Sequence, residues 1–216
     1  MASVVDICNL AVSRLGDDAT ISSIDPPEGS TQAEYCARFW PIARDTLLQS
    51  HPWSFATARA TLAALTPETE AWAYAYAMPS NCLRVLSVQH YEAPDYGLNE
   101  STEYGIAMPS AYSPQPFAAE VFADGMAVIL TNQEEAAARY IRRVTDPSRY
   151  SPMFIEAASW LLASYLAGPM IKGTEGEKMA QYCTGMMEAM KARAIVADTA
   201  QRAGRPAHRV SWMASR

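Results

Sequence analysis

Residues 137–169, AARYIRRVTDPSRYSPMFIEAASWLLASYLAGP, contain a change in the spacing of apolar residues that decides the fold class. The first eight residues have the pattern of a short strand. From Ser151 onward apolar residues recur at helical spacing, and Gly168 with Pro169 is expected to end that helix. Its apolar face consists of Phe154, Ile155, Ala158, Leu161, Leu162, Tyr165 and Leu166. A strand-rich region therefore precedes this stretch, and a helical region begins inside it.

The residues after Pro169 predict a last helix, from about Thr174 to Ala203. Its apolar stripe consists of Met179, Tyr182, Cys183, Met186, Met187, Met190 and Ile195. Because methionine adapts its shape, this stripe indicates either core or a surface that adjusts to a neighbouring subunit. The segment GTEGEK at 173–178 lacks the spacing of a phosphate-binding loop and is better explained as the turn that starts the helix.

Residues 3–15 predict a first amphipathic helix, with Ser3 as its N-cap and Gly16 as its stop. A loop with two prolines follows.

A second helix is expected from Thr31, which is spaced with Glu34 as a capping box, to His51 and Pro52. Pro41 lies inside this segment and is expected to kink the helix or split it in two.

Between residues 54 and 144 the period changes to that of short strands joined by turns. The segments concerned are AWAYAYAMP, LRVLSVQHY, FAAEVFADGMAVILT and AARYIRRV. Asp124 and Gly125 give the strongest hairpin signal. Residues 91–116 are rich in Pro, Tyr, Ser and Gly and predict a long surface loop, which is either an interaction surface or simply mobile.

The order of these elements predicts an α+β fold, with a helical bundle built from the N- and C-terminal segments and a β-rich insertion between them. We expect the bundle to comprise residues 1–53 and 150–203, the insertion residues 54–149, and an extended C-terminal tail residues 204–216. Five aromatic residues are expected in the structural core: Trp40, Trp53, Phe55, Phe154 and Trp160. Arg142 and Arg143 are expected to alternate between a solvent face and a subunit contact.

Cys8, Cys36, Cys82 and Cys183 are scattered among apolar neighbours, which favours buried free thiols over a disulfide or zinc site. Free thiols suit a reducing cytoplasm. The apolar runs are shorter than the ~20 residues that cross a bilayer, and the N-terminus lacks a basic segment, so we expect neither export nor a membrane span.

The chain's last residues differ in charge from the rest. After Asp198 there is no acidic residue, and four arginines follow. They add four positive charges to a chain of net charge −6, so residues 1–198 carry −10. Such an acidic body argues against general binding to nucleic acid, because Lys and Arg supply most of the affinity for phosphates.

No pattern for catalysis, cofactor binding or metal binding is found in the sequence. His51, His90 and His208 lack metal-ligand spacing, and no GxSxG motif is present. We therefore expect no catalytic residues, cofactor or metal. Paired carboxylates for glycoside hydrolysis could be chosen only with a known geometry.

Four segments together resemble one family, the head-to-tail adaptor or tail tubular protein A of short-tailed bacteriophages. They are YCARFWPIARDTLLQSHPWSFATAR at 35–59, WAYAYAMPSNCLRVLSV at 72–88, residues 129–169, and the Met-rich last helix. Three motifs within these segments are specific for the family when they occur together: HPW-x-F-A, Y-x-x-P-x-x-C-L-R-V and R-Y-I-x-x-V-x-D-P-x-x-Y/F. Asn81 stands where this family commonly has an acid.

The resemblance implies a structural virion protein without enzymatic activity. It implies a ring of probably twelve copies that joins the portal protein to the tail nozzle protein, of the tail tubular protein B type, and continues the channel for DNA ejection. Genomic DNA would pass through the lumen without sequence-specific binding. The location implied is the virion tail, assembled in the cytoplasm of the bacterial host, with no membrane partner.

The resemblance also implies two contact regions. The tail would bind the portal through Arg202, Arg205, His208, Arg209, Trp212, Met213 and Arg216, with Trp212 as the buried anchor. The long loop would face the nozzle with Tyr91, Tyr96, Tyr104 and Tyr112. A body at −10, repeated around a ring, would give a negative lumen that keeps DNA from sticking.

Three alternatives stay open. A tail component that hydrolyses polysaccharide would need two carboxylates about 5 to 10 Å apart across a cleft. A helical adaptor of a cellular complex would explain the tail but not the four segments. The tail itself could be a frayed, solubilising terminus.

Overall fold

The computed structural model describes residues 2–67, 71–92 and 114–201. These residues form an α+β fold with two compact units. Of the described residues, the helical unit consists of residues 2–56 and 143–201, and the β unit of those between Thr57 and Arg142. The division of the chain lies a few residues from the predicted boundaries at 53/54 and 149/150. Phe55 packs on Phe154, and Arg143 and Val144 bond Asp45 and Tyr150, so these residues belong to the helical unit.

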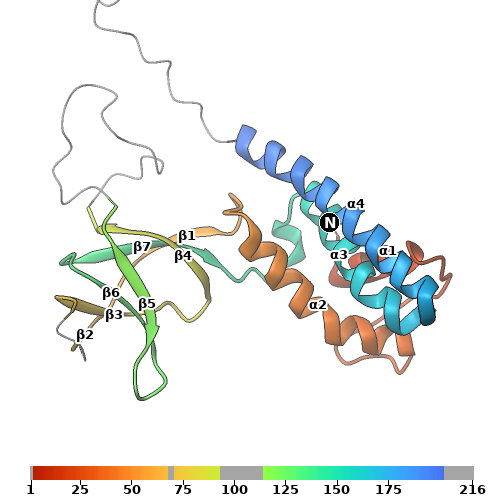
Figure 1. Ribbon diagram of the computed structural model, residues 1–216, viewed down its shortest axis with the longest axis horizontal. Coiled ribbons are helices and arrows are strands. Elements are labelled where there is room, and N and C mark those ends of the chain that lie inside the picture. Colours follow the sequence, from red (N-terminus) through yellow and green to blue (C-terminus); the bar gives the residue numbers. More distant parts are fainter. Residues whose placement is uncertain (1, 68–70, 93–113, 202–216) are drawn as a thin grey trace, which may run out of the picture. The chain divides into compact units, whose positions relative to one another are not determined.

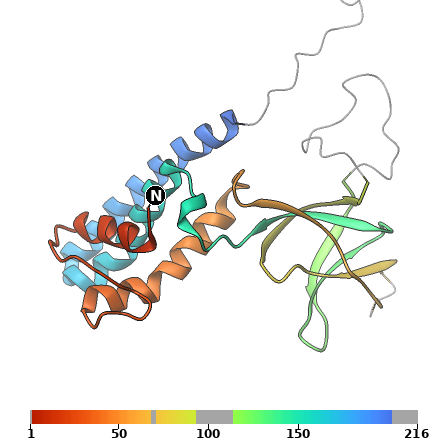
Figure 2. The same cartoon turned by 180° about the vertical axis from the view of Figure 1, so that it is seen from behind.

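The helical unit contains α1 (Val4–Ser13), α2 (Thr31–Ser50), α3 (Pro152–Ile171) and α4 (Gly173–Ala200), with a short 3-10 turn at Pro147–Arg149. Helix α3 packs against all three others. Figures 1 and 2 show α4 along one side of α3, with α1 and α2 on the other. The predicted α3 is therefore the core helix of the unit.

Serine side chains start three of the four helices. The Ser3 hydroxyl accepts from the Asp6 N–H and the Asp6 carboxylate accepts from the Ser3 N–H, which makes a capping box. Ser30 and Ser151 cap α2 and α3 in the same way through their hydroxyl groups. The predicted box of Thr31 and Glu34 is wrong by one residue, since Ser30 is the cap and Thr31 is already helical.

Two prolines lie inside helices that continue past them. Helix α2 runs unbroken through Pro41, so of the two predicted outcomes, a kink or a split, the split is wrong. Helix α3 continues past Gly168 and Pro169 to Ile171 because the Gly168 carbonyl still accepts a hydrogen bond, from the Lys172 N–H at 3.0 Å. Each proline removes one backbone donor, a cost that the buried faces of these helices offset.

Helix α3 is the one helix among the described residues that is long and apolar enough to cross a membrane. Of its most apolar window, 56% is buried inside the protein. This burial, and its packing against three helices, are those of a core helix.

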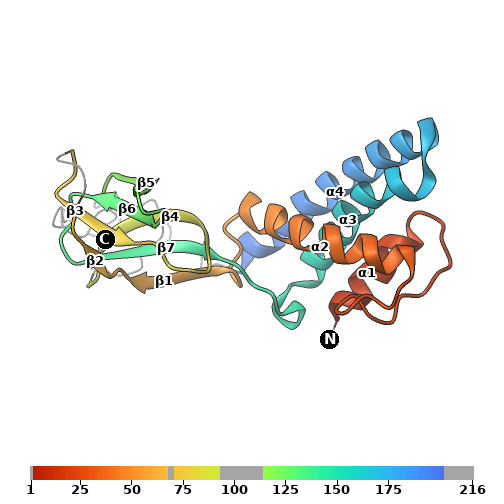
Figure 3. The same ribbon diagram turned by 90° about the horizontal axis from the view of Figure 1, so that it is seen from below.

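The β unit contains two antiparallel sheets (Figure 3). One has the order β1 (Thr57–Thr61), β7 (Ala136–Arg142), β4 (Cys82–His90), and the other β2 (Ala64–Leu65), β3 (Tyr74–Ala77), β6 (Ala127–Thr131), β5 (Phe117–Val121). Both sheets contribute to a cluster of buried residues: Leu62, Tyr76, Val88, Ile129, Ala136 and Ala138. The predicted strands and the Asp124–Gly125 hairpin between β5 and β6 are confirmed, with Gly125 at φ 87°.

Of the five aromatic residues predicted in the core, Trp40, Trp53 and Phe154 are buried. Phe55 and Trp160 are only partly buried, which corrects their placement. The Trp160 ring contacts the Arg14 guanidinium, 4.1 Å from the ring centroid, and the Tyr182 ring, whose centroid is 6.0 Å away.

All four cysteines are free thiols. Cys8, Cys36 and Cys183 are buried, whereas Cys82 at the start of β4 is partly exposed. Burial raises the pKa of the Cys183 thiol. A hydrogen bond between the Cys8 and Cys36 thiols, together with burial, raises the pKa of Cys8 as well.

Candidate functional site

Most of the residues predicted to contact partners lie outside the described part of the chain. This is the case for the predicted portal-binding residues: Arg202, Arg205, His208, Arg209, Trp212, Met213 and Arg216. It is also the case for Tyr96, Tyr104 and Tyr112 of the predicted nozzle-facing loop. The structure therefore shows only how the residues next to these segments are held.

Tyr91, at the start of the predicted loop, is exposed and held at its backbone. Its N–H donates to the Glu135 carbonyl at 2.9 Å, and its hydroxyl donates to the Glu92 carboxylate at 2.9 Å. At the other end of the loop Gln115 forms a bridge with Val88, and its N–H donates to the Val88 carbonyl at 2.8 Å. The predicted loop 91–116 is thus shorter at this end than expected, because Gln115 pairs with β4.

The end of α4, from which the tail departs, is held by a buried carboxylate. Asp198 is 5% exposed. Its carboxylate accepts from the Ser54 N–H at 2.9 Å and from the Ser54 hydroxyl at 2.6 Å, and His51 Nε2 lies 3.4 Å away. These bonds tie the last turn of α4 to the segment that follows α2. We call this group, Ser54, Asp198 and His51, the α4 anchor.

The α4 anchor contains the residue types of a serine hydrolase triad in a different arrangement. In a triad the histidine accepts the serine proton. Here the Ser54 hydroxyl donates to the Asp198 carboxylate instead. The geometry is that of a structural tie. Ser54 and Asp198 are 144 residues apart along the chain, and no short-range pattern in the sequence indicates their contact.

An aromatic cluster lies beside the α4 anchor. Trp53 and Phe55 of the HPWSF motif both contact the Phe154 ring, with centroids 5.2 and 5.1 Å apart. The Trp53 indole N–H donates to the Leu47 carbonyl at 2.9 Å, and the Tyr150 hydroxyl donates to the Val144 carbonyl at 2.6 Å. Burial raises the pKa of Tyr150 to about 12. The motif therefore fixes the end of α2 against the start of α3.

The outer face of α4 is exposed and has few charges along one stripe. Tyr182 and Val196 are 58% and 70% exposed. Between them lie Gly185, Ala189 and Ala192, all exposed, so the five residues recur at alternating intervals of three and four. This spacing puts them on one side of the helix, and small residues let another helix approach closely. We call these five residues the α4 outer stripe.

The stripe predicted from methionines lies elsewhere on α4. Cys183 and Met187 are buried against α3, and Met179, Met186 and Met190 are partly buried beside them. The methionines therefore belong to the α3–α4 packing in the helical unit. Sequence reasoning missed the outer stripe because glycine and alanine give little hydrophobic signal.

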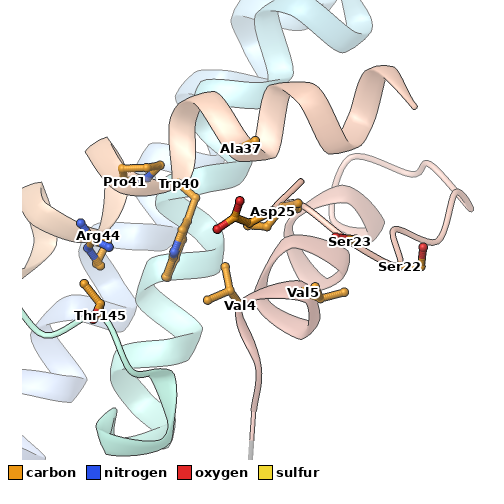
Figure 4. Close-up of a pocket in the computed structure, with 11 residues that line it drawn as sticks. Val4, Val5, Ser22, Ser23, Asp25, Ala37, Trp40, Pro41, Arg44 and Thr145 are labelled. Atoms are coloured by element: carbon orange, nitrogen blue, oxygen red, sulfur yellow. The ribbon is translucent and has the colours of Figure 1, made fainter. Parts of the chain in front are cut away.

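A crevice of about 550 Å³ lies in the helical unit, between the start of α1, the loop at 22–25 and α2. Figure 4 shows Trp40 of α2 facing Val4 of α1, with the Asp25 carboxylate pointing toward Trp40. Ala37 and Pro41 also line it. Because Pro41 has no N–H, the Ala37 carbonyl lacks its usual helical donor. The crevice thus combines an apolar wall with oxygen acceptors.

Arg143 is exposed, as predicted for a residue on a solvent face, and it also forms an ion pair within the helical unit. Its Nε donates to Asp45 of α2 at 2.9 Å, and Arg44 Nε donates to the other oxygen of the same carboxylate at 2.7 Å. Asp45 is therefore shared by two guanidinium groups within the helical unit. Arg142 ends β7 and is partly buried.

Among the residues described by the structure, no group of three or more His, Cys, Asp or Glu side chains could hold a metal ion.

A scan against protein-family models finds no family that matches the chain, and a search of curated proteins finds no matching relative. Function is therefore argued from the four sequence segments and from the geometry of the two units.

Proposed function

We propose that this protein is a structural subunit of a head-to-tail adaptor ring in a short-tailed bacteriophage, located in the virion tail between the portal and the tail nozzle. One observation carries the proposal. The α4 outer stripe is an exposed row of small and apolar residues. The end of this helix is held by the α4 anchor, and a segment that contains arginines but no acidic residue follows it directly in the sequence.

A ring requires heterologous contacts, in which one surface of a subunit meets a different surface of the next. The helical unit offers several exposed apolar side chains on different helices for such contacts. They are Leu10 of α1, Ile42 of α2, Met153 of α3, and Tyr182 and Val196 of α4. In this proposal the α4 outer stripe packs against a neighbouring copy, and DNA passes through the channel of the ring.

Each of the three motifs that carry the family resemblance contains a residue with a structural role in the fold. This supports the use of the three motifs together as a sign of the family. HPWSF supplies Trp53 to the aromatic cluster and Ser54 to the α4 anchor. Asn81 of the second motif accepts a hydrogen bond from the Tyr140 hydroxyl at 3.2 Å. The Asp146 carboxylate of the third accepts from the Ser148 N–H at 3.0 Å and starts the turn into α3.

In the proposed assembly the basic tail binds the portal, with Trp212 buried and the arginines paired with acidic groups. The α4 anchor supports this role because it fixes the point at which the tail begins. The Tyr91 end of the long loop would contact the nozzle protein.

The proposal is tested by the mass of the complex with the purified portal ring, measured by light scattering or sedimentation. The full-length chain is expected to add about a dozen copies to the ring, and a chain ending at Ala203 is expected to add none. A Trp212→Ala variant of the full-length chain should bind more weakly than an Arg193→Ala variant, whose change lies on α4 outside the tail.

Equal thermal melting of the full-length and shortened chains would show that the shortened chain is folded. If the full-length protein does not bind the portal, or if the shortened chain binds equally well, the proposed docking role is wrong.

A further inference from the structure

The β unit contains a cavity of about 440 Å³ that none of the roles above uses. Three tyrosines and two glutamates are among the residues that line it: Tyr74, Tyr76, Tyr91, Glu134 and Glu135. We call this the tyrosine–glutamate pocket. All its lining residues belong to the β unit.

Three neighbouring segments bring these side chains together. Tyr74 and Tyr76 are two residues apart on β3, so they share one face of the strand, and their ring centroids are 6.4 Å apart. Tyr91 follows β4, and its N–H donates to the Glu135 carbonyl. Glu134 and Glu135 form the end of the turn between β6 and β7. The pocket is thus fixed by backbone hydrogen bonds and strand geometry.

The aromatic wall is rigid and uncharged. Tyr76 is 3% exposed, and its hydroxyl donates to the Gln133 carbonyl at 2.9 Å. Burial raises the pKa of Tyr76, and the nearby Tyr74 and Glu134 raise it further. The phenol therefore stays neutral at physiological pH, and the carboxylates supply the negative charge of the pocket.

One of the two glutamates that line the pocket has an unusual backbone conformation. Glu135 has φ 50°, in the left-handed region that side-chain-bearing residues seldom adopt. Its carboxylate lies 3.6 Å from His90 Nε2. For the adjacent Glu134 carboxylate, the described residues provide no hydrogen-bond or ion-pair partner. One negative charge at the mouth of the pocket is thus left for a ligand.

We propose that the tyrosine–glutamate pocket binds the arginine side chain of a partner protein's peptide segment. Aromatic ring faces attract cations, and carboxylates pair with them. A guanidinium group suits this pocket better than an ammonium group, because its flat surface stacks on a tyrosine ring while its N–H groups bond a carboxylate in pairs. The charge of the pocket is complementary to arginine, and its volume accommodates one long side chain.

The inference stands apart from ring assembly and is tested on the full-length protein without portal. The probe is acetyl-Gly-Arg-Gly-amide, titrated while backbone and tyrosine-ring NMR signals are followed. We expect shifts centred on Glu134, Glu135 and Tyr74, with a dissociation constant on the order of 1–10 mM for so small a ligand. The matched peptide with citrulline, which keeps the shape and removes the charge, should bind at least about tenfold more weakly.

Variants of the protein separate charge from shape. The double variant Glu134→Gln and Glu135→Gln should lose about tenfold or more in affinity, and Tyr74→Leu should lose less. Glu120→Gln removes a carboxylate from an exposed position on β5, outside the pocket, and should bind like the unchanged protein. Unchanged strand signals in the NMR spectra show that each variant is folded.

Three results would overturn the inference. They are no shifts at peptide concentrations well above the expected dissociation constant, shifts only outside the pocket, or equal binding of the citrulline peptide. A neutral oligosaccharide that shifts the pocket signals when the arginine peptide does not would also overturn it, and would favour sugar stacking on the tyrosines. Loss of portal binding would leave it unaffected, so the two proposals fail separately.

Discussion

At the scale of single residues, the space around a Cβ position decides what a substitution does. Two glycines of α4 illustrate this. Gly176 faces α3, and a methyl group added there would lie 3.1 Å from the Ala167 carbonyl oxygen. Gly185 belongs to the α4 outer stripe and has open space around its Cβ position. The same change therefore meets a helix backbone at one position and solvent at the other.

We predict that Gly185→Ala stabilises the protein by about 1 kcal/mol, because alanine favours a helix interior by that amount over glycine. Gly176→Ala gains the same helix preference but crowds the α3 backbone, which costs about 1–3 kcal/mol, so a net loss is expected. Urea unfolding followed by circular dichroism measures both. Stabilisation of both variants would show that α3 and α4 are not as close as 3.1 Å requires.

At the scale of elements, the tight connection between α3 and α4 carries backbone strain. Lys172 is both the last cap of α3 and the first of α4, and it has φ 61° and ψ 162°. That region of backbone conformation is essentially restricted to glycine. Gly173 follows with φ 62°. A connection of one residue between two long antiparallel helices therefore places a side chain where none is favoured.

Replacing Lys172 by glycine is expected to raise the free energy of unfolding by about 1 kcal/mol, because glycine adopts this conformation without strain. Thermal melting should show a higher midpoint. Gln181→Gly, at an exposed position inside α4, serves as the control and should lower stability by about 1 kcal/mol. A lower midpoint for the Lys172 variant would mean that the conformation at this connection is different.

These elements show how far sequence patterns reach. The helix starts at Ser3 and Ser151 and the hairpin at Gly125 were predictable, because caps and turns are short-range features. The helix end at Ile171 was not, since Pro169 is a local stop signal that tertiary packing overrides. The α4 anchor and the tyrosine–glutamate pocket join residues distant in sequence, which no periodicity reveals.

At the scale of the whole molecule, four carboxylates of the helical unit keep their negative charge to a lower pH than they would in the unfolded chain. Hydrogen bonds lower the pKa of four carboxylates: that of Asp6 by bonds from Ser3, Asp17 by Gln32, Glu28 by Ser22 and Asp146 by Ser148. All four belong to the helical unit. Their ordinary pKa values are 3.8 for aspartate and 4.5 for glutamate.

We predict that the helical unit loses stability as the pH falls below about 4. A carboxylate whose pKa is lower in the folded protein contributes its full stability above the pKa of the unfolded chain, and loses it as the pH falls through the folded value. Because three of the four groups are exposed and Asp17 is partly exposed, the change should be gradual. Helical circular dichroism during urea unfolding at several pH values measures it.

The double variant Asp17→Asn and Glu28→Gln should show a shallower pH dependence than the unchanged protein. Asp18→Asn, at the neighbouring position, is the control. The interpretation is wrong if the double variant and the control respond to acid alike.

The α4 anchor has a mechanical consequence. A pull on the chain beyond Gln201 reaches the Ser54–Asp198 bonds first, within one turn of the helix end. The force is then transmitted through these bonds to the segment after α2, and α4 does not separate from α3 one turn at a time. Bonds that share a load resist more than bonds broken in succession, so a subunit attached through its tail could bear tension while its helical unit stays folded.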